Sequence, residues 1–442
     1  MSNIAEIAES QLHDPFYLKS VTELGDEHTL VTTRDVCSSS GIKLVSSGTR
    51  FDSSLYQKLL QHKLAPPLDQ CLSTESSVTS ASLVAELPGL FAQDGWLQSM
   101  KSAITDVGIF SEILSKVPLH PSIAFKLTVM REKRPELFRH SLYLALVCIY
   151  IGIRHRLDSN KLVHLASAAL LHDIGILHID PALLEHNHTL SDAERRHLYA
   201  HPLTAWMILK ECTDYSQEVL DAVLQHHERL DGSGYPLGCE GDAIGLYGRI
   251  LAVAEIVASR QGDANSPLER MRLEAILKLN SRRYGRQLIG YLDVFYRNNA
   301  EIPPCTEAGK QVIRDQLDST LSAIAGWERL WDAQHPGSHA FETIDKRIRN
   351  LKMEMLDAGL SPLGNIDSMK DIEEAPRACF EMHILLEEVV WQLHGVLDEI
   401  RRRWPDLGSE GPASCGTQAQ SWIIETEKTI KPTRNVNSNH IA

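Results

Sequence analysis

The chain has 442 residues, a formal net charge of −14 at pH 7 and 43% hydrophobic residues. The length predicts more than one domain, and the charge argues against a protein that coats a nucleic-acid polymer or an anionic membrane. The negative charge does not exclude a small anionic substrate, because bound metal cations can reverse the sign of the charge within one site.

Cysteine usage and the N-terminus favour a cytoplasmic protein. The eight cysteines are scattered and none forms a CxxC pair, so we expect reduced thiols. The start MSNIAEIAESQLHD lacks the basic and apolar stretches of a signal peptide. The longest apolar run, Leu142–Ile153, is shorter than the roughly 20 residues that span a bilayer. It predicts a buried core helix, and we expect no membrane partner.

The predicted fold is mainly α, with a small α/β module of unknown role over residues 1–95. Within that module, Leu30–Val36 and Ile42–Val45 have the composition of short strands. Residues 96–298 have the dense apolar pattern of a helical domain. There, Lys161–Leu171 is apolar almost all round, which is typical of a central helix.

Residues 299–405 are predicted to form a C-terminal helical region. Two apolar stripes run through it, one from Ile313 to Trp331 and one from Met382 to Ile400. Such stripes fit either an extension of the core or a homodimer interface. The polar, weakly patterned residues 406–442 are predicted to be disordered.

Eight side chains in the helical domain have the chemistry and spacing of metal ligands. They are Glu136, His140, His172, Asp173, His201, His226, His227 and Glu255. A mixed imidazole and carboxylate set suits Fe, Mn or Zn better than Ca. Two such ions a few Å apart would clamp a phosphoryl oxygen and hold a hydroxide as nucleophile.

The spacings explain how one site could collect these ligands. Glu136 and His140 are four residues apart, so a helix projects both from one face. Adjacent helical residues point about 100° apart, so His172 could bind one ion while Asp173 bridges to a second. Glu255 lies among apolar residues, where an unpaired carboxylate would cost several kcal/mol and therefore needs a cation.

Each pair alone also has a structural interpretation. A His-Asp pair before Gly175 is commonly a helix end, and Glu136 with His140 could be a solvated pair on a helix surface. The joint occurrence of all eight residues favours the metal site.

The same segment resembles the HD-GYP branch of the HD phosphohydrolase superfamily. The resemblance rests on Phe138-Arg139-His140-Ser141, Leu171-His172-Asp173-Ile174-Gly175, His201-Pro202 and the stretch from His226-His227 to Asp231-Gly232-Ser233-Gly234-Tyr235-Pro236. It covers roughly residues 120–298.

This resemblance implies an all-helical domain with two or three divalent transition-metal ions, Fe or Mn being favoured, that hydrolyses cyclic di-GMP. It implies His172 and Asp173 as catalytic residues and the family's common ligands at His172, Asp173, His201, His226 and His227. Glu136 and His140 match the positions of a third metal site in some members. The loop of Asp231, Gly232, Gly234, Tyr235 and Pro236 would lie near the cyclic dinucleotide or form a docking surface for a protein partner.

The chain departs from the family pattern near the substrate. Ile176 stands where members usually carry a lysine that supports a substrate phosphate, and Glu255 stands where they carry an aspartate. Two alternatives to cyclic di-GMP hydrolysis therefore stay open. One is hydrolysis of another nucleotide, and the other is a catalytically weak regulator that binds metal and nucleotide.

Overall fold

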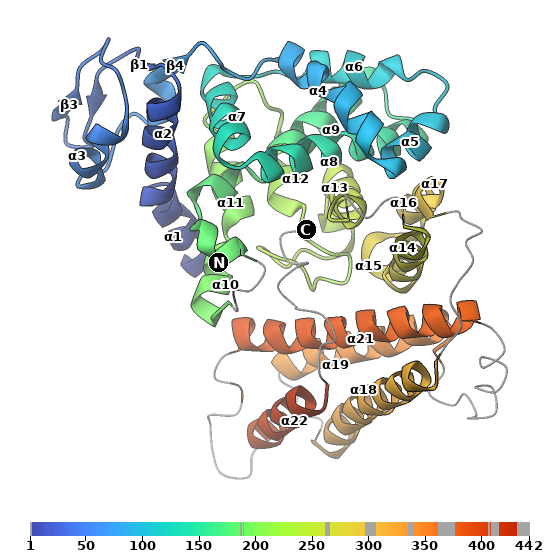
Figure 1. Ribbon diagram of the computed structural model, residues 1–442. Helices are drawn as coiled ribbons and strands as arrows, with labels where there is room; N and C mark the ends of the chain where they lie inside the picture. The colour runs from blue at the N-terminus through green and yellow to red at the C-terminus, as the bar shows by residue number, and fades with distance from the viewer. Residues whose placement is uncertain are drawn as a thin grey trace. The chain divides into compact units, whose positions relative to one another are not determined.

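The computed structural model describes most of the chain, in two compact units, Met1–Gly262 and Asp263–Ile441. The described residues are 2–185, 188, 190–260, 266–296, 306–334, 339–360, 376–404, 407 and 415–430. Each unit is described by itself below, and Figure 1 gives the element labels.

The N-terminal part of the first unit combines helices with short strands, as the sequence predicts. Helices α1 (Ser2–Gln11) and α2 (Pro15–Glu27) precede strand β1 (Leu30–Thr32). Strand β1 pairs antiparallel with β4, with Leu30 opposite Thr74. The other elements are β2 (Val36–Cys37), β3 (Lys43–Val45), η1 (Ser53–Leu55), α3 (Tyr56–Leu60), η2 (Leu68–Gln70) and β4 (Leu72–Thr74), and β2 pairs antiparallel with β3.

The rest of the first unit is helical. Its elements are α4 (Ser80–Gln93), α5 (Gly95–Ser102), α6 (Gly108–Ser115), α7 (Pro121–Lys133), α8 (Pro135–Arg154), α9 (Ser159–Leu171), η3 (Ile174–His178), η4 (Pro181–Leu184), α10 (Asp192–Leu198), α11 (His201–Leu209), α12 (Gln217–Gln225), η5 (Gly241–Ala243) and α13 (Leu246–Ala258).

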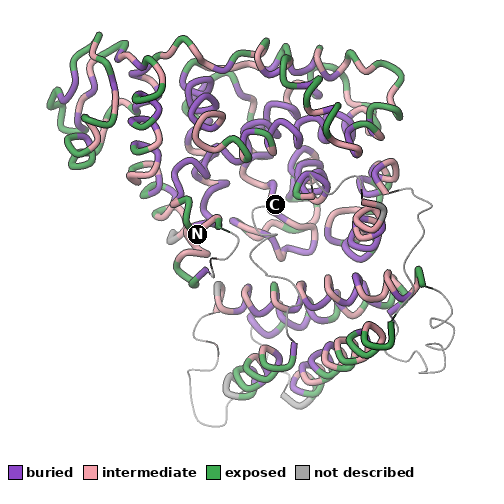
Figure 2. Tube along the Cα trace, viewed as in Figure 1, coloured by how far each residue is buried: buried purple, intermediate pink, exposed green. Residues whose placement is uncertain are grey.

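Helices α8, α9 and α13 form the centre of this unit, and most of their residues are buried (Figure 2). Helix α8 packs against both α9 and α13. A Cβ on Gly152 would lie 2.6 Å from the Leu162 side chain, so α8 and α9 approach closely there. Asp158 caps α9 by accepting a hydrogen bond from the Lys161 amide.

The predicted core helix at Leu142–Ile153 is confirmed as part of α8. By length and composition α8 would also pass as a membrane span, but 72% of its most apolar window is buried inside the protein. Its apolar surface is therefore covered by neighbouring helices.

The second unit contains short helices α14 (Pro267–Leu279), α15 (Ser281–Tyr284), α16 (Arg286–Gly290) and α17 (Asp293–Tyr296), and long ones, α18 (Glu307–Gln334), α19 (His339–Asp357), α21 (Pro376–Arg403) and α22 (Cys415–Thr429). The predicted apolar stripes lie on α18 and α21, and α19 packs against both. The buried Arg347 guanidinium joins α19 to Glu399 of α21 at 2.9 Å.

Two features of the second unit differ from the sequence prediction. Helix α22 lies inside residues 406–442, which were predicted to be disordered. Its Trp422 is buried against α18 and donates a hydrogen bond to the Ala323 carbonyl, so one aromatic anchor orders a weakly patterned segment. Cys379 is disulfide-bonded, although reduced thiols were expected. Cys37, Cys71, Cys148, Cys212 and Cys239 are free.

The predicted domain limits at residues 95 and 298 do not coincide with the division at Gly262. Helix α14 belongs to the second unit because it packs against α21.

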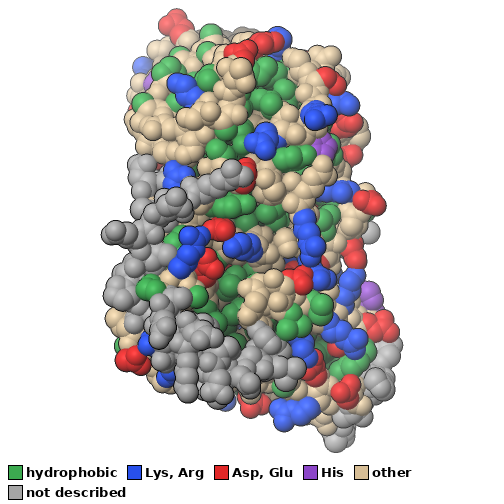
Figure 3. All heavy atoms as spheres, turned by 90° about the vertical axis from the view of Figure 1, so that its right-hand side faces the viewer, with side chains coloured by type: hydrophobic (Ala, Val, Ile, Leu, Met, Phe, Trp, Pro, Cys, Tyr) green, Lys and Arg blue, Asp and Glu red, His purple; other side chains and the backbone are tan. Residues whose placement is uncertain are grey.

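On the face in Figure 3, basic and acidic side chains are interspersed among apolar ones.

Candidate metal centre

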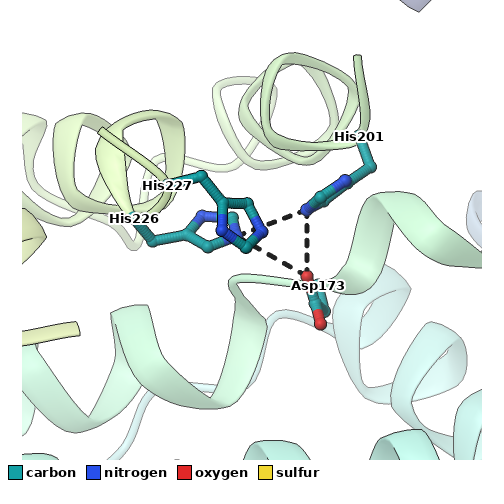
Figure 4. A group of neighbouring side chains, drawn as sticks. All are labelled: Asp173, His201, His226 and His227. Carbon is teal, nitrogen blue, oxygen red and sulfur yellow. Dashed lines mark hydrogen bonds and ion pairs between the residues drawn. The ribbon is translucent and has the colours of Figure 1, made fainter. Parts of the chain in front are cut away.

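Seven of the eight predicted ligands come together in two groups inside the first unit. The first group is Asp173, His201, His226 and His227, and the second is His140, His172 and Glu255. In each group, one ligand atom per residue lies within 4.8 Å of the others. Figure 4 shows the first group, in which the carboxylate faces imidazoles that come from two other segments.

Helix ends bring these ligands together. His172 and Asp173 follow α9, His201 begins α11, and His226 and His227 follow α12. His140 and Glu255 project from α8 and α13, which pack against each other. A Cβ on Gly175 would lie 2.3 Å from the His201 carbonyl oxygen, so the glycine lets η3 approach the start of α11.

Three histidines are fixed with the same ring nitrogen turned away from the site. His172, His201 and His226 each place Nδ1 2.6–2.8 Å from the carbonyl oxygen three residues earlier. A carbonyl can only accept, so each Nδ1 carries the proton. In the neutral rings, each Nε2 therefore presents a lone pair to the centre, the arrangement that a metal-ligating histidine needs.

The first group collects acceptors that cannot satisfy one another. The Nε2 atoms of His201 and His226 lie 3.3 Å apart, and Asp173 Oδ1 lies 3.2 Å from the former and 3.6 Å from the latter. Both Asp173 oxygens are buried and make no hydrogen bond. Converging lone pairs around a buried charge are stabilised only by a cation, so these residues fit a divalent metal ion.

Asp173 also faces the second group, through its other oxygen. Oδ2 lies 3.0 Å from His172 Nε2, which in turn lies 3.8 Å from Glu255 Oε2. The second Glu255 oxygen lies 2.8 Å from His140 Nε2. The Asp173 carboxylate thus stands between the groups, with one oxygen toward each, as a bridging ligand would.

The electrostatics of the metal-free centre follow from burial and charge. Burial lowers the pKa of His226 to about 4. Burial opposes protonation of His172 too, but the Asp173 and Glu255 carboxylates outweigh it and raise its pKa to about 9. Metal binding at the second group must therefore displace a proton from His172 at neutral pH.

Glu136 does not join either ligand group. It is exposed in the first turn of α8, where an acidic side chain is favoured by the helix dipole. The geometry therefore supports two ion positions rather than a third one built on Glu136.

The Gly-Tyr-Pro loop packs inward, onto the first ligand group. The Tyr235 ring stacks on His227 at 4.5 Å and on Tyr199 at 4.0 Å between centroids. A Cβ on Gly234 would lie 2.4 Å from the His227 carbonyl oxygen, so only glycine allows this approach. Asp231 closes the turn by accepting hydrogen bonds from the Ser233 amide and hydroxyl. This packing favours a role in holding His227 over a docking surface for a partner.

Sequence reasoning missed the residue that anchors this loop, Glu228. Its buried carboxylate accepts three backbone hydrogen bonds at 2.7–3.0 Å, from Leu237, Gly238 and Cys239. In the sequence, Glu228 is only one acidic residue directly after His226-His227. A solvated carboxylate in an exposed loop would have the same sequence, so the sequence does not predict that Glu228 is buried.

Removing this anchor is expected to destabilise the loop. Glu228→Ala leaves three amides without their charged acceptor and should cost about 3 kcal/mol of stability, measured by thermal melting of the full chain. Asp242→Ala is the control, because Asp242 is fully exposed and pairs with Arg249 at the surface. Equal melting temperatures for the two variants would contradict the assigned role.

At position 176 the chain has isoleucine in place of the lysine that the family usually carries, and this change also affects how the side chain packs. Ile176 is fully buried in η3, so its side chain belongs to the core. Arg249, a basic residue of the same domain, donates hydrogen bonds to the Ile244 carbonyl and to Asp242.

Comparison with known proteins agrees with this centre. The HD domain family, HD_5, matches residues 126–287. That span contains all seven clustered ligands, the His172-Asp173 pair among them. The chain therefore contains an HD domain over residues 126–287. HD domains bind divalent metal ions, and the two groups described above could hold such ions.

Curated relatives of this chain carry the names of cyclic-dinucleotide phosphodiesterases. It is 30% identical over 148 residues to the cyclic di-GMP phosphodiesterase PA4108 of Pseudomonas aeruginosa, covering 34% of this chain and 36% of the relative. It is 34% identical over 128 residues to the 3'3'-cGAMP-specific phosphodiesterase 3 of Vibrio cholerae, covering 29% and 28%. The matches thus span about a third of each protein.

A solved structure also matches, that of Bd1817, a HDG"Y"P protein from Bdellovibrio bacteriovorus. The identity is 15%, the TM-score is 0.32, and the match covers 60% of this chain and 94% of that one.

Proposed function

We propose that this protein is a metal-dependent phosphodiesterase that hydrolyses cyclic di-GMP. The observation that carries the proposal is the Asp173 carboxylate between two buried ligand groups. Cations bound there would polarise phosphoryl oxygens and lower the pKa of a bound water. The relatives named for cyclic di-GMP hydrolysis support the substrate class.

The roles of the chain's own residues follow from their contacts. Asp173 would hold both ions at a fixed spacing, with His201, His226 and His227 completing one side and His140, His172 and Glu255 the other. The mixed nitrogen and oxygen ligands suit Fe, Mn or Zn, of which the family resemblance favours Fe or Mn. The Nδ1 bonds to carbonyls turn the Nε2 atoms of His172, His201 and His226 toward the site without a metal, and His172 becomes a ligand once it loses its Nε2 proton.

Cyclic di-GMP and 3'3'-cGAMP are the substrates to compare, because relatives named for each match this chain. We expect the Mn- or Fe-loaded full chain to hydrolyse cyclic di-GMP, to lose activity with EDTA and to regain it with added metal. Chromatography of the products measures the rate for each dinucleotide. Faster turnover of 3'3'-cGAMP would reassign the substrate within the same class.

A metal-loaded chain that cleaves neither dinucleotide would support the regulator alternative. The buried Ile176 favours that alternative, since it removes a cation that phosphate would contact.

A further inference from the structure

A buried glutamine connects the N-terminal module to the first ligand group. Gln11, the last residue of α1, is fully buried. Its Nε2 donates to the His197 carbonyl at 2.6 Å, and its Oε1 accepts from the Thr204 hydroxyl. Its main-chain oxygen lies 3.1 Å from His178 Nδ1, which must donate. One residue thus bonds to three separate segments of the helical domain.

Two of these contacts flank the metal ligand His201. The His197 carbonyl lies next to the Leu198 carbonyl, which fixes the His201 ring. Thr204 lies one turn further along α11, on the helix that His201 begins. Gln11 therefore holds the backbone before His201 and the helix after it.

The third contact reaches the segment that follows Asp173. His178 ends η3, which starts directly after Asp173 and packs tightly on the start of α11. Gln11 thus ties together the segments that carry two members of the first group, Asp173 and His201, which lie 3.2 Å apart.

Other N-terminal residues complete the same buried network. With Nδ1 protonated, His178 Nε2 accepts from Lys126 at 3.3 Å. The Lys126 ammonium lies 3.1 Å from Asp69 and 3.7 Å from the centre of the Tyr17 ring. Tyr17 also stacks on His178 at 4.7 Å. Both ring nitrogens of His178 are therefore bonded, one to Gln11 and one to Lys126, and these bonds hold the end of η3 in one position.

We propose that Gln11 is a positioning residue for the ion held by Asp173, His201, His226 and His227. The N-terminal module is then a working part of the metal centre. The inference rests on the proposed metal-dependent function, because it requires this group to bind an ion. If the Gln11 side-chain hydrogen bonds are removed, we expect the second group, His140, His172 and Glu255, to bind its ion with unchanged affinity, because Gln11 does not contact that group.

Metal affinity tests this role without reference to any substrate. Gln11→Met keeps the side-chain length and removes both side-chain hydrogen bonds. Metal-free full-length protein is titrated with Mn²⁺, and the free ion is followed by electron paramagnetic resonance. We expect one of two ions to bind about 10- to 100-fold more weakly, the usual effect of losing a group that orients a ligand. The other ion should bind as in the unsubstituted chain.

The matched control is Gln392→Met, which removes a buried glutamine of the second unit that bonds to Asn280. It should leave both Mn²⁺ affinities unchanged. Thr204→Val, which removes one Gln11 bond, should weaken the same ion by a smaller factor, and it decides the matter if Gln11→Met does not fold.

Unchanged affinities, or an equal loss at both ions, would overturn the positioning role while the proposed function stands. A failure of the unsubstituted chain to bind Mn²⁺ would instead overturn the metal centre itself, and with it this inference.

Discussion

Asp173→Asn is expected to lower turnover of cyclic di-GMP by about 10²–10³-fold or more, the scale seen when a central electrostatic group is removed. The reason is the position of the carboxylate, which has one oxygen toward His172 and the other toward His201. An asparagine keeps the shape but loses the charge and turns a donor toward one ligand group. Metal analysis of the purified variant should show that both ions are lost or weakened.

Asp158→Asn is a suitable control because Asp158 lies at the other end of the same helix. It is exposed and caps α9 through the Lys161 amide. It should cost about 1 kcal/mol of stability or less and leave metal content unchanged. If Asp173→Asn retained two ions and normal turnover, the bridging role would be wrong.

Glu255→Gln is expected to remove one ion per chain and leave the other. Its carboxylate supplies the only negative charge that belongs to the second group alone, and both its oxygens are buried without a hydrogen bond. The first group keeps Asp173 and three imidazoles, which suffice for one ion. The number of bound ions per chain, measured by mass spectrometry of metals, should therefore fall from two to about one. Turnover should be strongly reduced.

Glu255→Asp separates charge from length at this position. It restores the residue that the family usually carries, one methylene shorter, so we expect two ions and measurable turnover. Loss of both ions in Glu255→Gln would show that the groups bind cooperatively and are not independent.

Much of the centre could be predicted from the sequence, because its ligands cluster in short motifs with metal chemistry. His172-Asp173 and His226-His227 are adjacent pairs at helix ends, and Glu255 is a carboxylate in an apolar helix. The structure brings these residues together with His140 and His201. Glu136 has the same i,i+4 spacing to His140, but it is exposed. Such spacing predicts that two residues share a helix face. It does not predict which part of the protein that face contacts.

The supporting residues could not be predicted in the same way. Gln11 and Glu228 act through long-range or loop contacts, and a single glutamine or glutamate carries no local pattern. Helix α22 was missed for a related reason. Its order depends on Trp422 packing against α18, a tertiary contact that outweighs weak local preference.

The central claim is that two ions are held side by side, with Asp173 between them. Titrating metal-free chain with Mn²⁺ and recording electron paramagnetic resonance tests it most directly. Two bound ions per chain whose signals broaden through mutual coupling are the predicted result, with the coupling absent in Glu255→Gln. One ion per chain, or two uncoupled ions, would contradict the bridged centre.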